Sequence, residues 1–161
     1  MTTCVMTSGN KNSPNPCKDS FTKDGKDVLQ QRIDATGTKI DAALKTIHEK
    51  SPQARVLLVG YPAILPETGG CPGQLPVAAG DMDYLRGVIR SLNTMIAKSA
   101  AAGNATYVDT YAPGIGHDAC QPAGTKWVEG ILPESPAERA HPNALGHQGM
   151  AAAVAAAAGR A

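Results

Sequence analysis

Three segments of the chain have the pattern of α-helices. In residues 27–50 and 82–102, apolar side chains recur mostly three, four or seven positions apart, which places them along one face of a helix. Asp81 is the expected N-cap of the second segment, and Gly103 is its expected end. The third segment is rich in alanine and runs from about residue 143 to residue 159. The pattern therefore predicts three helices.

Two short apolar runs lie between these helices, at about residues 54–60 and 105–109. Continuous apolar runs of this length are typical of strands that are buried on both faces of a parallel sheet. The composition of residues 8–26 and 110–140 predicts two loops, of which the first is polar. The alternation of helices and strands predicts an α/β fold with a parallel sheet and right-handed crossovers. Because two parallel strands make a poor core, the fold looks like part of a larger one.

Composition and charge exclude several classes of protein. The chain has 161 residues, the length of one domain, and its net charge of +1 offers no basic surface for nucleic acid. No stretch approaches the roughly 18 uninterrupted apolar residues of a membrane span, so we expect no transmembrane segment. The first residues lack a basic stretch followed by an apolar one, so no signal peptide is visible. The sequence leaves the oligomeric state open.

The four cysteines sit singly in segments rich in Gly, Pro, Asn or Ser. No two of them form the Cys-x-x-Cys pair that is common in metal sites, and an even number of isolated loop cysteines is typical of disulfides. Four cysteines allow three pairings, of which we favour Cys4–Cys17 with Cys71–Cys120. Disulfides indicate an oxidising compartment, so we expect a secreted protein. The alternative is a cytosolic protein with four unpaired cysteines.

A carboxylate precedes a histidine by three positions just before the last helix, in Glu138-Arg-Ala-His141. At this spacing the Glu138 carboxylate can accept a hydrogen bond from Nδ1–H of His141. Such a bond fixes the tautomer and stabilises the imidazolium that forms when a histidine acts as a general base. Pro142 restrains the backbone behind it. Taken alone the pattern is common, and the alternative is that His141 only caps or packs against the helix.

The run His141-Pro-Asn-Ala-Leu-Gly-His147 and four upstream stretches resemble conserved segments of one known family. The upstream stretches are residues 56–62 (VLLVGYP), 75–81 (LPVAAGD), 105–109 (ATYVD) and 116–120 (GHDAC), the last followed by Trp127. In this order they resemble the SGNH (GDSL-like) hydrolases, especially the secreted actinobacterial esterases and lipases. The resemblance covers nearly the whole chain. It implies a flavodoxin-like, three-layer α/β fold with a parallel sheet, of which this chain is the C-terminal part.

In that family a serine in a Gly-Asp-Ser motif attacks an ester carbonyl, and a histidine is the general base. The resemblance implies that His141 is the base and that Glu138 orients it. Glu replaces the usual Asp here, and some members use the main-chain carbonyl at that position instead. It implies a carboxylic ester hydrolase, an esterase or lipase, that acts on an ester or lipid substrate without a metal or other cofactor. We expect His117 and Asp118 either to contact substrate at the mouth of the site or to hold the loop beside Cys120.

The other conserved blocks of the family do not occur in this chain. The sequence contains no Gly-Asp-Ser. Ser8-Gly9-Asn10 resembles part of the block that supplies the oxyanion asparagine, but we interpret residues 4–17 as a disulfide loop. We therefore expect residues 1–161 to form a single, N-terminally truncated domain that carries the base without the nucleophile. The alternative function is a non-catalytic secreted remnant or a binding module.

The remaining histidines and the tryptophan support weaker hypotheses. A zinc site built from His117, His141 and His147 is disfavoured, because the sequence has no His-x-x-x-His pair on one helix face. His48 is expected to be inert. Trp127 is expected either to pack in the core beside the disulfide loop or to meet an acyl chain.

Overall fold

The helices and strands follow the predicted order after a short N-terminal region. The computed structural model describes residues 2–159. Its elements are α1 (Thr2–Thr7), α2 (Pro16–Ser20), β1 (Thr22–Lys23), β2 (Lys26–Asp27), α3 (Val28–Lys50), β3 (Leu57–Val59), α4 (Met82–Ala102), β4 (Thr106–Val108) and α5 (Ala144–Ala157), with short 3₁₀ turns at Ala79–Asp81 and Ala112–Gly114. The three long helices and the two strands of the prediction are all present.

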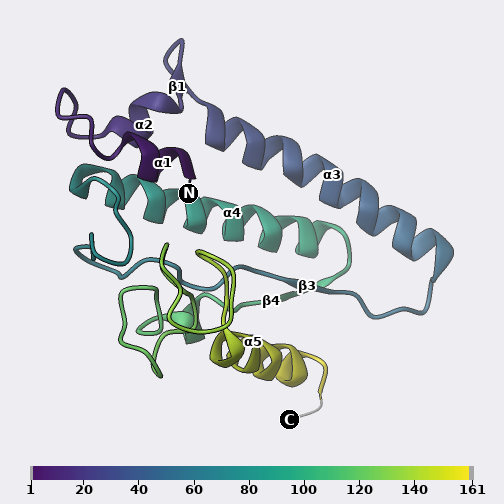
Figure 1. Ribbon diagram of the computed structural model, residues 1–161. Helices are drawn as coiled ribbons and strands as arrows, with labels where there is room; N and C mark the ends of the chain where they lie inside the picture. The colour runs from purple at the N-terminus through teal and green to yellow at the C-terminus, as the bar shows by residue number, and fades with distance from the viewer. Residues whose placement is uncertain (1, 160–161) are drawn as a thin grey trace.

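Strands β3 and β4 form the predicted parallel pair, in which Leu57, Leu58 and Val59 lie opposite Thr106, Tyr107 and Val108. Helix α4 packs on one side of the pair and α5 on the other, while α3 covers the outer side of α4 (Figure 1). The arrangement is an α/β fold with helices on both sides of a parallel sheet. None of the helices within residues 2–159 is long and apolar enough to cross a membrane.

Helix α3 is fixed by its first turn and by its contact with α4. The Asp27 carboxylate accepts hydrogen bonds from the main-chain N–H groups of Leu29 and Gln30, which otherwise have no partner at the start of a helix. Further along, a Cβ atom at Gly37 would lie 3.2 Å from Cγ of Met95 on α4. The absent side chain at Gly37 therefore lets the two helices approach closely.

The prediction of one polar loop over residues 8–26 is wrong in detail. This region contains helix α2 and a two-stranded hairpin, β1–β2, whose turn is Asp24-Gly25. Both turn residues have positive φ, 51° and 72°, which matches the right-handed twist of the flanking strands in a two-residue hairpin. The Asp-Gly pair is the sequence signal for this turn. The flanking strands have only two residues each, too few to show an alternating pattern.

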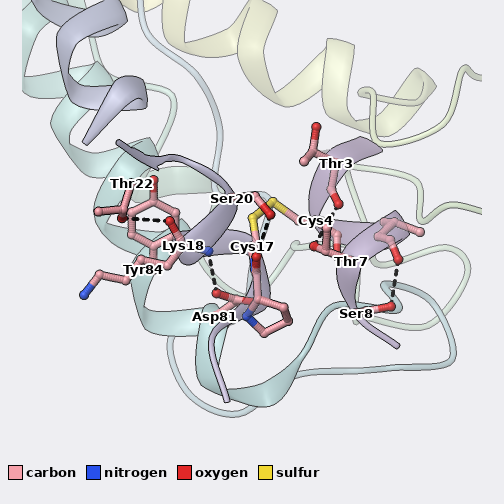
Figure 2. Close-up of a disulfide and its surroundings, with 12 residues drawn as sticks. Thr3, Cys4, Thr7, Ser8, Cys17, Lys18, Ser20, Thr22, Asp81 and Tyr84 are labelled. Atoms are coloured by element: carbon pink, nitrogen blue, oxygen red, sulfur yellow. Dashed lines mark hydrogen bonds between the residues drawn. A yellow bond between two sulfur atoms is a disulfide. The ribbon is translucent and has the colours of Figure 1, made fainter. Parts of the chain in front are cut away.

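Asp81 lies at the N-cap position of α4, as predicted, but its side chain does not cap that helix. Its fully buried carboxylate accepts hydrogen bonds from the main-chain N–H groups of Cys17 (2.8 Å) and Lys18 (2.9 Å), in the first turn of α2 (Figure 2). Asn15, the residue at the N-cap position of α2, makes no side-chain cap. Asp81 thus caps a helix more than 60 residues away in sequence and ties the N-terminal region to α4.

Both disulfides form with the favoured pairing. Cys4 and Cys17 have Cα atoms 4.5 Å apart, and the Cα atoms of Cys71 and Cys120 are 5.5 Å apart. The first bridge joins α1 to α2 (Figure 2). The second joins the loop after β3 to the loop after β4. Both bridges lie in or against a single apolar cluster that also includes Leu75 and Val128.

A charged pair is buried in the loop before α5. Lys126 is 1% exposed and Glu129 is fully buried, and Nζ of Lys126 lies 3.3 Å from Oε2 of Glu129 and 2.7 Å from Oε2 of Glu134. Burial alone would raise the pKa of the Glu129 carboxyl, but the hydrogen bonds that it accepts outweigh burial and lower the pKa to about 2. The folded protein therefore holds Glu129 ionised.

We expect Asp81→Ala to lower the free energy of unfolding by about 1–3 kcal/mol, because it leaves the buried N–H of Cys17 without a partner. Urea denaturation measures the change. Asp41→Ala, at an exposed acid of α3, is the control and should change stability by less than about 0.5 kcal/mol. Equal effects of the two substitutions would contradict the capping role.

The free energy of unfolding should also fall in acid, because Glu129 becomes protonated. Because its pKa is lowered in the folded state, its contribution is fully present above the ordinary value of 4.5 and is lost as the pH falls toward about 2. A lowering of this size corresponds to about 3 kcal/mol. Urea denaturation between about pH 6 and pH 2.5 should therefore show a smaller acid-induced loss for Glu129→Gln than for the unaltered protein. The same loss in both proteins would show that Glu129 does not titrate in this range.

Candidate active site

His141 lies in a pocket at the carboxyl end of β3. The pocket has a volume of about 340 Å³, and most of its lining is apolar: Val59, Gly60, Tyr61, Pro62, Ile64, Val128, Ala140, His141, Pro142 and Met150. His141 itself is exposed. The carboxyl ends of the strands are where open parallel sheets bind their ligands. The pocket therefore combines a titratable side chain with apolar walls in the place where this type of fold holds its sites.

The His141 imidazole is oriented by a main-chain carbonyl. Nδ1 lies 2.7 Å from the carbonyl oxygen of Arg139. A carbonyl oxygen can only accept a hydrogen bond, so we assign the proton of the neutral ring to Nδ1. Nε2 then carries the free lone pair. This is the tautomer that a general base needs, since Nε2 can take a proton while Nδ1–H stays bonded.

Glu138 is close to His141 in sequence, but its carboxylate has another partner. It accepts a hydrogen bond of 3.1 Å from the main-chain N–H of Arg139, and the Glu138 main-chain carbonyl accepts one of 3.2 Å from the N–H of His141. Ala140, inside this turn, has a φ of 55°, a left-handed conformation that costs an alanine about 1 kcal/mol or more. The tight turn aims the Arg139 carbonyl at the ring.

The main chain around His141 is held by the segment that precedes the loop. The N–H of Glu129 donates to the carbonyl of His141 (3.0 Å), and the N–H of Asn143 donates to the carbonyl of Trp127 (2.8 Å). Val128 and Pro142 form an antiparallel bridge between these two bonds. Oδ1 of Asn143 accepts from the N–H of Gly146 and so caps α5. The histidine is thus fixed between a short strand-like pairing and the start of a helix.

His117 and Asp118 do not line the pocket of His141. The His117 ring stacks on Trp127, with centroids 4.7 Å apart and planes 14° apart, and its Nδ1 is 2.6 Å from the carbonyl oxygen of Thr125. The buried Asp118 carboxylate accepts bonds from the N–H of Cys120 and from the side chain of Gln121. In this arrangement both residues hold the loop beside Cys120, which is one of the two roles expected for them.

The other candidates do not line the pocket of His141. Nε2 of His48 is 2.9 Å from the carbonyl oxygen of Gly103, at the far ends of α3 and α4. His147 is exposed on α5. Across residues 2–159, no three His, Cys, Asp or Glu side chains come together as a metal site would require. Ser8 follows α1 and its hydroxyl donates to the Val5 carbonyl, inside the loop closed by Cys4 and Cys17 (Figure 2).

Two parts of the site were not predicted from the sequence. The resemblance offered the main-chain carbonyl of residue 138 as an alternative orienter, but the carbonyl that contacts the ring is that of Arg139. It has no side-chain signal, because every residue carries a carbonyl group. The burial of Lys126 and Glu129 is also invisible in the sequence, since charged residues in a loop are normally exposed. Tyr61, half exposed at the rim of the pocket, was noted only as part of the resembling stretch.

Residues 13–148 match the GDSL-like Lipase/Acylhydrolase family. The chain is 39% identical over 151 residues to Lipase 2 of Streptomyces coelicolor, an alignment that covers 92% of this chain and 50% of that protein. It is 33% identical over 158 residues to an esterase of Streptomyces scabiei, covering 86% of this chain and 46% of the relative. The chain thus spans about half the length of the curated relatives it matches.

The fold agrees with two solved structures. Phospholipase A1 from Streptomyces albidoflavus superposes with a TM-score of 0.76 at 25% identity, over 97% of this chain and 61% of that one. An extracellular lipase from Streptomyces rimosus superposes with a TM-score of 0.75 at 20% identity, over 96% of this chain and 62% of that one, and this likeness concerns the fold alone. The expected α/β fold is confirmed. By its sequence match over most of its length, the chain belongs to the GDSL-like lipase/acylhydrolase family.

Proposed function

We propose that the complete protein hydrolyses carboxylic esters by acyl transfer to a serine, and that this chain supplies the general base, His141. The observation that carries the proposal is the 2.7 Å contact between Nδ1 of His141 and the Arg139 carbonyl, which leaves Nε2 free beside an apolar pocket. Family membership supports the reaction class.

In the proposed reaction, Nε2 of His141 takes the proton of the attacking serine hydroxyl as its oxygen bonds to the ester carbonyl carbon. The imidazolium then gives this proton to the leaving alkoxide as the ester C–O bond breaks. Water repeats the sequence on the acyl-enzyme and releases the acid. The Arg139 carbonyl keeps Nδ1–H bonded throughout, so that the ring does not rotate between the two proton transfers. The Glu138 carboxylate, bonded to the N–H of Arg139, takes no direct part in these proton transfers.

The nucleophile and the oxyanion donors are proposed to lie in a part of the protein outside these residues. The sequence contains no Gly-Asp-Ser, and the matched relatives are about twice as long as the aligned region. A base without a nucleophile cannot acylate. On its own, the 161-residue chain is therefore proposed to be inactive. The alternative function is a non-catalytic binding module.

The proposed substrate is an ester with an apolar acyl chain. The walls of the His141 pocket include Tyr61, Ile64 and Met150, which suit hydrocarbon better than a charged group. Relatives named as a lipase, an esterase and a phospholipase A1 agree with this class. Secretion is proposed from the two disulfides, because such bonds persist in oxidising compartments.

We expect the isolated chain to hydrolyse p-nitrophenyl esters no faster than its His141→Ala variant, because no oxyanion donor is in place and each missing donor costs about 10²–10³ in rate. Joining it to the part of Lipase 2 that it does not cover should bring activity, which His141→Ala then abolishes. Turnover by the isolated chain would contradict the assignment of the nucleophile, and Ser8 would be the next residue to substitute. Activity of the chimera that survives His141→Ala would refute the role of His141.

The role of Glu138 can be tested in the same active chimera. We expect Glu138→Ala to lower kcat by less than about tenfold, because the Arg139 carbonyl remains on Nδ1. Removing a carboxylate that does orient a catalytic histidine typically costs about 10⁴. Glu67→Ala, at an exposed acid of another loop, is the matched control. A loss of several thousandfold for Glu138→Ala alone would assign the orienting role to its carboxylate.

A further inference from the structure

The Glu129 carboxylate has more partners than its ion pair with Lys126 requires. Besides Nζ of Lys126, it accepts hydrogen bonds from three donors: the Ser135 hydroxyl (2.6 Å), the Glu134 N–H (2.9 Å) and Nδ2 of Asn143 (2.8 Å). Every described polar side-chain atom buried in this structure has a partner. Both oxygens of this carboxylate are occupied, and its donors come from both sides of the loop that carries His141.

These bonds fix the loop at two points along its length. Glu134 and Ser135 lie on the outgoing part of the loop, several residues before Arg139, and Asn143 lies just after His141. Glu129 also contacts His141 directly through the main chain, by donating its N–H to the His141 carbonyl. One buried side chain thus joins the segment before the Arg139 carbonyl to the segment after the imidazole. The distance between carbonyl and ring depends on both segments.

Apart from the Glu129 bonds, the loop is held mainly by main-chain hydrogen bonds near its two ends, from the N–H of Ile131 to the Gln74 carbonyl and from the N–H of Ala140 to the Gly130 carbonyl, and by the contact of Lys126 with Glu134. Between residues 131 and 141 no side chain is fully buried, and Leu132 is 73% exposed. In general, an apolar pair in place of Lys126 and Glu129 would stabilise the fold about as well, because the free energy needed to bury two charges is about equal to that gained from their attraction. It would, however, offer no acceptor to Glu134, Ser135 or Asn143. The charge is therefore placed where it orders a polar loop.

We propose that Glu129 is a positioning residue for His141: by accepting hydrogen bonds from Ser135, the Glu134 N–H and Asn143, it holds the Arg139 carbonyl on Nδ1 and so selects the tautomer of the base. The inference rests on the proposed function of His141, which it deepens. It makes a claim about the imidazole that can be tested in this chain without any turnover.

The test is nuclear magnetic resonance of the 161-residue chain with ¹⁵N-labelled histidine at about pH 8.5, two units above the ordinary histidine pKa. The shifts of the two ring nitrogens report the ratio of the Nδ1–H to the Nε2–H tautomer. His141→Gln identifies the signals. We expect mainly the Nδ1–H form in the unaltered chain, and a ratio lower by about three- to tenfold in Glu129→Gln, the loss of roughly one hydrogen bond.

The signals of His48 distinguish a specific change at His141 from a general loosening of the fold. Nε2 of His48 bonds to Gly103, at the far ends of α3 and α4, so its ratio should not change in Glu129→Gln if that variant is folded. Glu67→Gln, an exposed substitution, is the matched control. An unchanged His141 ratio in folded Glu129→Gln would overturn the proposal, and so would equal changes at His48 and His141.

If Glu129→Gln does not fold, Ser135→Ala replaces it. This variant removes one donor to the carboxylate from a half-buried position and should lower the His141 ratio about two- to threefold, in the same direction. No change in folded Ser135→Ala overturns the proposal. Failure of the proposed esterase activity would be seen separately, as an inactive chimera, and would leave the tautomer result standing.

Discussion

The pairing of residues 127–129 with residues 141–143 is the contact on which the site depends. Two main-chain hydrogen bonds and the Val128–Pro142 bridge join the two ends of the loop formed by residues 130–140. Asn143, at the end of the pairing, is also the N-cap of α5. The same contact therefore ends the loop and starts α5. It places His141 beside the carboxyl end of β3.

The packing of α5 follows from the same contact. Trp127 lies against the first turns of the helix, where a Cβ atom at Gly146 would meet the Trp127 carbonyl and one at Gly149 would overlap the indole ring. Glycine at these two positions is required by close approach and not by backbone conformation, since neither has a positive φ. His117 also stacks on the indole, so Trp127 links the start of the loop after β4 to the helix that follows His141.

Much of the fold could be predicted because its long elements have a clear period and its strands a clear composition. Helix α2 and the β1–β2 hairpin were missed because they are too short for any period, and α2 is capped by Asp81, which no local pattern connects to it. His141 could be singled out because its side chain can carry acid–base chemistry, and its role as the base stays a prediction. A main-chain carbonyl was among the expected orienters, but the sequence could not point to that of Arg139, because every residue carries one. The burial of Glu129 was not predicted, because contacts between segments decide it.

A carbonyl and a carboxylate orient a histidine with different consequences. Both fix the Nδ1–H tautomer, but a hydrogen bond to a neutral acceptor is about half as strong as one to a charged acceptor. In the proposed reaction, the imidazolium formed on proton transfer would therefore be stabilised less by Arg139 than by a bonded aspartate. The exposed Glu138 carboxylate is bonded elsewhere, and solvent screens its charge. With the weaker acceptor, the ring depends more on the rigidity of the loop that presents the carbonyl. In this fold main-chain hydrogen bonds and the buried Glu129 carboxylate hold that loop together.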